Sequence, residues 1–269
     1  GGATPSVHIE PIFIQKEYTV TYEAAPTSKG VVNANFSGDK VRGGTTVTFT
    51  AVPNSGETIT GWTVNGKVQN GETGSTFVWT VPNGYAATPQ ITSYSITAVM
   101  TAGEYTVTYT EPANGRLTAS VASGNKVSGG TSVRFIAMPD EHYEVDTWTV
   151  NGTVQGETGE SLTVNITEIT EVEVSFKLKQ YDVNLVQSVN GIVTASPDAA
   201  KAEANSTVEF TAAADTGYHL KHWLVNNIIT DDDGTGRLAV TIVDNTTVEP
   251  VFEINTFTVD YITEGNSGN

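Results

Sequence analysis

The amino-acid sequence predicts an all-β, or at least β-dominated, chain in which three small modules follow one another as an elongated array. Two observations carry this prediction. Apolar and polar residues alternate with a period of two over many short segments, which is typical of strands with one buried face. The pentapeptide WTVNG of residues 62–66 also returns at 148–152 and, as WLVNN, at 223–227. Internal repetition of this kind indicates a tandem-repeat architecture.

The copies keep a common register along the 269 residues. Trp148 lies 86 positions after Trp62, and Trp223 lies a further 75 positions on. The phenylalanines that follow the preceding GGT, GGT and NST segments keep the same two spacings. The unit is therefore about 75 residues long, and the first copy carries about ten extra residues within WTVPNGYAATPQITSYS, 79–95.

This register divides the chain into three full repeats, at residues 18–103 (with the insertion 79–95), 104–179 and 180–255. HIEPIFIQKEY aligns with TVEPVFEINTF, which closes the third repeat. Residues 1–17 are therefore expected to hold a few residues added for expression and then the last strand of a preceding repeat. Residues 256–269 are expected to begin a further repeat. The connections KLKQ and EINT lack glycine and proline, so we expect stiff joints between the units.

Each repeat is expected to contain short strands separated by turns rich in Gly, Asn, Pro and Ser. In the second repeat, alternating apolar series run through Tyr105–Tyr109, Val133–Ala137 and Val172–Phe176. The pair Asn151-Gly152 predicts a two-residue hairpin turn, because both turn positions need positive φ. Residues 196–206 come nearest to a helical pattern, and we expect one short turn of helix there.

The repeated tryptophan has two interpretations, a core residue or an exposed platform that stacks on sugars or peptides. A platform repeated three times should repeat its polar partners as well. The residues after the hairpin turn are Lys67, Thr153 and Ile228, which share no chemistry. We therefore expect buried tryptophans, each of which would cost about 3–5 kcal/mol to remove from a small module.

Composition excludes several classes of function. The formal net charge of -17 argues against nucleic-acid binding, which needs clustered Lys and Arg. The chain has no cysteine, which removes disulfides, thiol nucleophiles and thiolate metal sites. There is no run of about 18 apolar residues, as a membrane-spanning helix requires. These features suit a secreted bacterial protein, and its acidic surface favours a monomer.

The segment 129–152, GGTSVRFIAMP followed by YEVDTWTVNG, resembles the divergent internalin-B B-repeat family of bacterial cell-surface proteins. The resemblance covers residues 18–254 as three copies. It implies extracellular modules in tandem on surface or wall-attached proteins, with a β fold related to the β-grasp, and it implies no catalytic residues. Family members carry a Gly-Tyr pair, which the third copy has at Gly217-Tyr218, whereas the others have His142-Tyr143 and Glu57-Thr58.

Two segments are candidate binding sites. The insertion 79–95 contains Trp79, Tyr85 and Tyr94, which would form a recognition surface if exposed, although a longer strand pair covering its own module explains them as well. The loop TDDDGTGR supplies Asp231 and Asp233 as calcium ligands, with a solvated acidic loop as the alternative. His219 and His222 are three apart, which on a strand puts them on opposite faces and disfavours a shared zinc ion.

Enzyme motifs are missing from the sequence: it has no G-x-S-x-G, no H-E-x-x-H and no phosphate-binding glycine loop. We therefore predict a non-catalytic protein without a cofactor. The predicted role is a stiff extracellular spacer, with weak adhesion to host or cell-wall protein or glycan. The alternative is a carbohydrate- or protein-binding module that uses the aromatic insertion of the first repeat.

Overall fold

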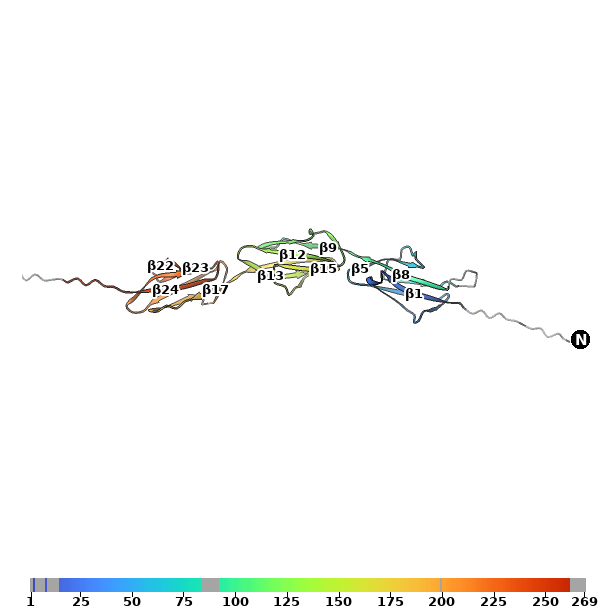
Figure 1. Cartoon of the computed structure of the whole chain (residues 1–269), viewed down its shortest axis with the longest axis horizontal. Helices are drawn as coiled ribbons and strands as arrows, with labels where there is room; N and C mark the ends of the chain where they lie inside the picture. The colour runs from blue at the N-terminus through green and yellow to red at the C-terminus, as the bar shows by residue number, and fades with distance from the viewer. Residues whose placement is uncertain (1, 3–7, 9–14, 84–91, 199, 262–269) are drawn as a thin grey trace, which may run out of the picture.

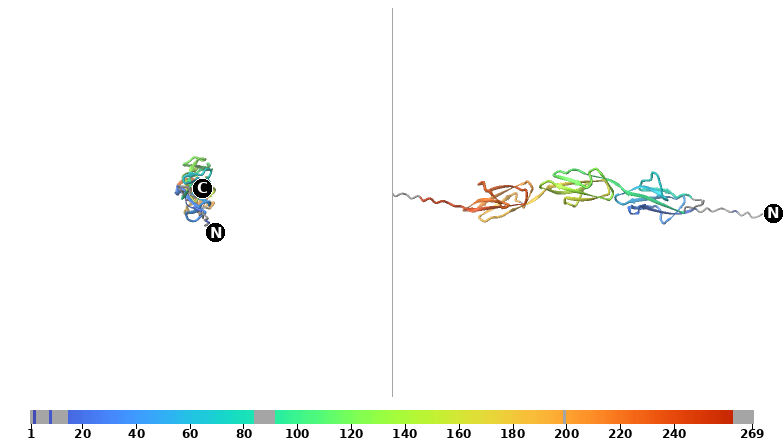
Figure 2. Two further views of the ribbon diagram at one scale, coloured as in Figure 1. Left: turned by 90° about the vertical axis from the view of Figure 1, so that its right-hand side faces the viewer. Right: turned by 45° about the horizontal axis from the view of Figure 1, so that its top comes forward.

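The computed structural model describes residues 2, 8, 15–83, 92–198 and 200–261, and these form three β modules in a row (Figure 1). Viewed from the end of the row, the modules lie one behind another (Figure 2). The only helix in the described residues is one 3₁₀ turn, Thr27–Lys29, and none is long and apolar enough to cross a membrane. The predicted all-β fold with three tandem modules is confirmed.

The strands recur in the same order in each module. The first module contains β1 (Glu17–Ala25), β2 (Gly30–Ala34), β3 (Lys40–Arg42), β4 (Thr46–Pro53), β5 (Glu57–Val64), β6 (Lys67–Val68), β7 (Thr76–Thr80) and β8 (Ser93–Ala102). The second contains β9 (Glu104–Tyr109), β10 (Gly115–Ala119), β11 (Lys126–Ser128), β12 (Thr131–Pro139), β13 (Tyr143–Val150), β14 (Thr153–Val154), β15 (Ser161–Ile166) and β16 (Thr170–Leu178). The third contains β17 (Gln180–Leu185), β18 (Gly191–Ser196), β19 (Lys201–Glu203), β20 (Thr207–Ala214), β21 (Tyr218–Val225), β22 (Ile228–Asp231), β23 (Arg237–Thr241) and β24 (Thr246–Ile254).

Every module is a sandwich of two sheets. In the first, a five-stranded sheet has the order β3-β1-β8-β5-β6 and a three-stranded sheet has the order β2-β4-β7, and the other two modules repeat both orders. The first and last strands of each module pair in parallel at the centre of the larger sheet. That parallel pair agrees with a β-grasp relative. A second sheet, however, covers the face on which a β-grasp carries its helix.

The core of each module lies between its two sheets and is centred on the repeated tryptophan. Trp62, Trp148 and Trp223 are all 0% exposed, which confirms the interpretation as core residues. Each comes from the larger sheet and lies in one apolar cluster with a fully buried phenylalanine of the smaller sheet. In the first module the indole also stacks on Phe77 at 5.4 Å. Full burial of so large a side chain makes it a main source of hydrophobic stabilisation.

The tight turn that follows each tryptophan strand is confirmed, with positive φ at both positions, including 49° and 73° at Asn151 and Gly152. The structure adds a reason for the asparagine. Asn151 Oδ1 accepts a hydrogen bond from Glu171 N–H at 2.7 Å, and Asn151 N–H donates to the Glu171 carbonyl at 2.9 Å. Asn65 and Asn226 make the same two bonds. The asparagine therefore ties the hairpin to the last strand of its module.

The short helical turn expected within residues 196–206 is wrong. Lys201–Glu203 forms β19, which pairs with β17 at the edge of the larger sheet, so that Tyr181 lies opposite Ala202. The alanine-rich composition favours a helix only weakly. Tertiary pairing with an existing strand therefore overrides that propensity.

A glycine at the start of the second strand packs against a large side chain of the last strand. A Cβ built on Gly115 would lie 2.6 Å from a ring carbon of Phe176 and 2.7 Å from the Met138 carbonyl oxygen. Gly191 faces Phe252 in the same way, and Gly30 faces Met100. The glycine is thus required by close packing between the two sheets.

We expect Gly115→Ala to destabilise the second module by about 1–3 kcal/mol, because the methyl group meets a rigid ring and a backbone oxygen. Amide hydrogen exchange of the whole chain measures this, with the other modules as internal references. Gly156→Ala is the matched control, since nothing lies within 4 Å of a Cβ at that position. Equal losses from the two substitutions would contradict the packing argument.

Candidate functional site

A single residue joins the first and second modules. Gly103 lies between the end of β8 and the start of β9. Its N–H donates to the Gly56 carbonyl of the first module at 2.9 Å, and its carbonyl accepts from Gly129 N–H of the second module at 2.7 Å. The joint residue is therefore hydrogen-bonded to both neighbours through its own backbone.

The second joint repeats this arrangement with different side chains. Lys179 N–H donates to the His142 carbonyl at 2.8 Å, and the Lys179 carbonyl accepts from Ala204 N–H at 2.9 Å. A side-chain contact is added here, because His142 Nδ1 lies 3.2 Å from the hydroxyl of Tyr181 in the third module. After the third module, Asn255 N–H donates to the Gly217 carbonyl at 2.8 Å.

The turn residue that accepts at each joint has positive φ, 83° at Gly56, 67° at His142 and 92° at Gly217. Each of these residues occupies the glycine position of the family's Gly-Tyr pair. The equivalent pair in the first copy is therefore Gly56-Glu57, and the expected pair Glu57-Thr58 is wrong by one residue. The joint role of this turn was not predicted from the sequence, although the recurring glycine marks its place.

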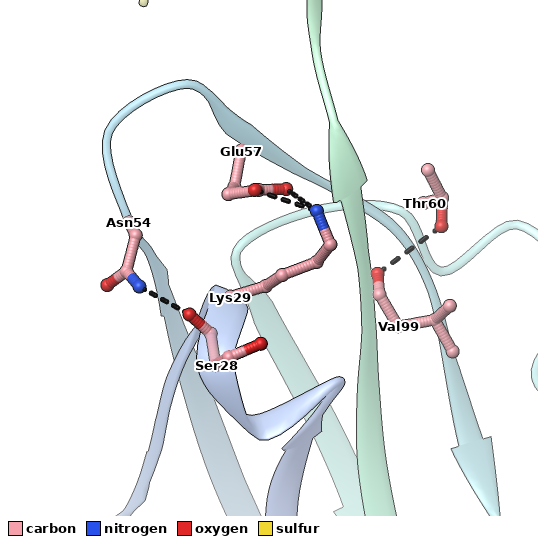
Figure 3. Close-up of polar contacts among 6 residues, drawn as sticks. All are labelled: Ser28, Lys29, Asn54, Glu57, Thr60 and Val99. Atoms are coloured by element: carbon pink, nitrogen blue, oxygen red, sulfur yellow. Dashed lines mark hydrogen bonds and ion pairs between the residues drawn. The ribbon is translucent and has the colours of Figure 1, made fainter. Parts of the chain in front are cut away.

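In the first module Glu57 occupies the place of the tyrosine in the Gly-Tyr motif, and it forms an ion pair with Lys29. Lys29 Nζ lies 2.7 Å from both carboxylate oxygens of Glu57 (Figure 3). The two side chains are only 27% and 17% exposed. Beside them Asn54 Nδ2 donates to the Ser28 carbonyl at 2.8 Å. The negative charge of Glu57 is thus neutralised by Lys29, which occupies the position that Asn114 has in the second module.

The two described aromatic residues of the insertion pack on each other and on the core of the first module. Trp79 on β7 and Tyr94 on β8 lie with ring centroids 4.8 Å apart, and Tyr94 is only 9% exposed. Burial, with a smaller contribution from neighbouring Tyr18, raises the pKa of Tyr94 above its usual value. Tyr85 lies outside the described residues. The two described aromatics therefore fit the longer strand pair better than an exposed platform.

In the acidic loop of the third module, Asp232 and Asp233 accept hydrogen bonds from within the loop. Asp231 ends β22 opposite His222, and Asp233 follows in the loop. The Thr235 hydroxyl and N–H donate to Asp233 Oδ1 and hold the pKa of Asp233 below its usual value. Across the described part of the chain, no three His, Cys, Asp or Glu side chains gather to hold a metal ion. Calcium binding by Asp231 and Asp233 stays a prediction.

The indole N–H of the core tryptophan has an acceptor in two of the modules. Trp62 Nε1 donates to the Gly74 carbonyl and Trp148 Nε1 to the Gly159 carbonyl, each at 2.9 Å. Trp223 Nε1 is buried without a partner among the described atoms. Its hairpin strand β22 has four residues where β6 and β14 have two, which changes the path of the loop that supplies the acceptor.

Trp148→Phe should therefore destabilise its module more than Trp223→Phe destabilises the third module. The first substitution removes the donor of the Gly159 carbonyl, whereas the second removes no hydrogen bond. The difference should be about 0.5–1.5 kcal/mol. Protection of core amides against hydrogen exchange reports each module separately, and equal losses would contradict the assignment.

Comparison with known proteins finds one family three times along the chain. The profile of the divergent InlB B-repeat domain matches residues 18–102, 105–180 and 181–256. No curated protein matches the chain. Because the three matches cover nearly all of the sequence, the chain belongs to the divergent InlB B-repeat family, a family of repeat domains from bacterial surface proteins, and holds three tandem copies of its domain.

Proposed function

We propose that the chain is a non-catalytic segment of a bacterial cell-surface protein, located outside the cell at the surface or wall, and that it acts as a stiff spacer. The observation that carries the proposal is the one-residue joint whose N–H and carbonyl are bonded to different modules. Rotation about the φ or ψ of that residue would break one of the two bonds, each of which contributes about 0.5–1.5 kcal/mol. Short bonded joints limit bending and keep the modules extended.

We also propose that the repeats span residues 18–103, 104–179 and 180–255, and the single-residue joints at Gly103 and Lys179 support these bounds. Most of residues 1–17 lies outside the described residues. In the tail, Phe257, Val259 and Tyr261 are 85%, 70% and 90% exposed and alternate as do Tyr181, Val183 and Leu185 in β17. This alternation supports the proposal that residues 256–269 begin a further repeat.

Weak adhesion to host or cell-wall protein or glycan is the secondary role of a monomeric chain. The alternative, recognition through residues 79–95, has less support because Trp79 and Tyr94 contact each other and the core. A glycan array separates the two. Binding that disappears when residues 84–91 are deleted would favour the alternative.

Stiffness at the second joint can be measured by pulsed electron resonance. The chain has no cysteine, so Thr163→Cys and Thr211→Cys place one spin label on each of two exposed strand positions. Inserting Gly-Ser-Gly-Ser after Lys179 should widen the distance distribution severalfold, because Gly/Ser segments behave as flexible coils.

The same insertion after Gly156, in an exposed loop of the second module, is the control and should leave the distribution narrow. A distribution that is already broad in the unmodified chain would overturn the spacer proposal.

A further inference from the structure

The second module has a notch in its larger sheet. A cavity of about 370 Å³ lies between the loop that follows β9 and the outer side of β13 and β16. Its wall includes Pro112, Thr147, Glu173 and Val174. This volume falls near the lower end of the range for ligand sites.

The notch exists because β9 leaves the sheet early. Its last rung with β16 pairs Tyr109 with Val172. In the first module the equivalent pairing continues three rungs past this level and includes Ala24 opposite Ala98 and Ala25 opposite Val99. Ala24 is buried, but the second module has Glu111 at that place, and Glu111 pairs instead with Arg116 at 3.4 Å. A carboxylate is costly to bury in a core position, and the third module, which has polar Gln187 at this place, ends its pairing at the same level.

The backbone of Val174 faces the space that β9 has left. The Glu171 carbonyl accepts from Asn151, which places the backbone groups of Glu171 on the β13 side. Backbone groups alternate between the two neighbours of a strand, so those of Val174 face the opposite side. Val174 is only 7% exposed, yet it lines the cavity. The described residues provide no hydrogen bond to its N–H or carbonyl from the β9 side.

The third module closes the same position in two ways. Trp148 lies opposite Val174, and Trp223 lies opposite Pro250, so Pro250 is the equivalent residue. Proline has no N–H to offer, and the Pro250 carbonyl accepts a hydrogen bond from the Ser188 hydroxyl. Proline and side-chain cover are the usual protections of an open strand edge. The second module has neither.

We propose that this notch binds a short extended peptide that carries a basic side chain and adds to β16 as a strand beside Val174. The unpaired backbone groups supply the main-chain hydrogen bonds of strand addition. The basic side chain would meet exposed Glu173, whose carboxylate accepts only from the Thr149 hydroxyl in the described part of the chain. The module around it has ten acidic and four basic residues between 105 and 178, which favours a cationic ligand.

The test uses the full chain and a fluorescent, end-capped hexapeptide of alternating lysine and valine. Fluorescence anisotropy should show saturable binding at one site per chain. A peptide with N-methylated backbone amides, and one with glutamate in place of lysine, should not bind. Val174→Pro should weaken binding at least about tenfold, a loss of 1.4 kcal/mol. The proline is accommodated at the equivalent Pro250, which lies within β24.

Two further variants keep the proposal falsifiable if Val174→Pro does not fold. Glu173→Lys, at an exposed position, should abolish binding of the lysine peptide and permit binding of the glutamate peptide. Pro250→Val combined with Ser188→Ala should open an equivalent notch and raise the stoichiometry to two. Absence of binding, equal binding of the N-methylated peptide, or displacement of the peptide by a neutral hexasaccharide would overturn the proposal.

Discussion

The contact between one buried indole and the opposing sheet is the interaction on which each module depends. A module of about 75 residues buries only about 60% of the surface of its unfolded chain. Its stability is therefore expected to be about 4–11 kcal/mol, of which a single buried tryptophan accounts for a large share. Trp62, Trp148 and Trp223 occupy the same rung opposite the last strand and are the largest fully buried side chains. The position leaves no room for a ligand.

The joints follow from where this core closes. The last strand of each module runs through the centre of its larger sheet, and at both joints a single residue separates that strand from the first strand of the next module. The joint residue therefore forms a hydrogen bond with a turn of the preceding module and another with a turn of the following module. Backbone groups make both bonds at Gly103 and at Lys179, so the two joints share one hydrogen-bond pattern although their residues differ.

Differences between the modules appear outside the core and the joints. The first module replaces an aromatic residue with the Lys29–Glu57 pair, the second places Glu111 just after β9 and pairs it with Arg116, and the third lengthens its hairpin to Asp231. Each change alters one surface while the sandwich stays the same. Variation of this kind gives otherwise equivalent modules different surface properties, of which the notch beside Val174 is the most specific.

Periodicity in the sequence was sufficient to determine the fold class, the three units, the hairpin turns and the burial of the tryptophans. These properties depend on local patterns: alternation selects the inward face of a strand, and Asn151-Gly152 tolerates the positive φ of its turn. The tertiary structure decided the rest, because the remaining properties depend on pairs of residues far apart in the chain. The bond from Gly129 to Gly103, the burial of Tyr94 and the strand at Lys201–Glu203 all arise from neighbours that only the folded sheets bring together. Sequence alone cannot specify them, since a strand edge is open or covered according to which other strand reaches it.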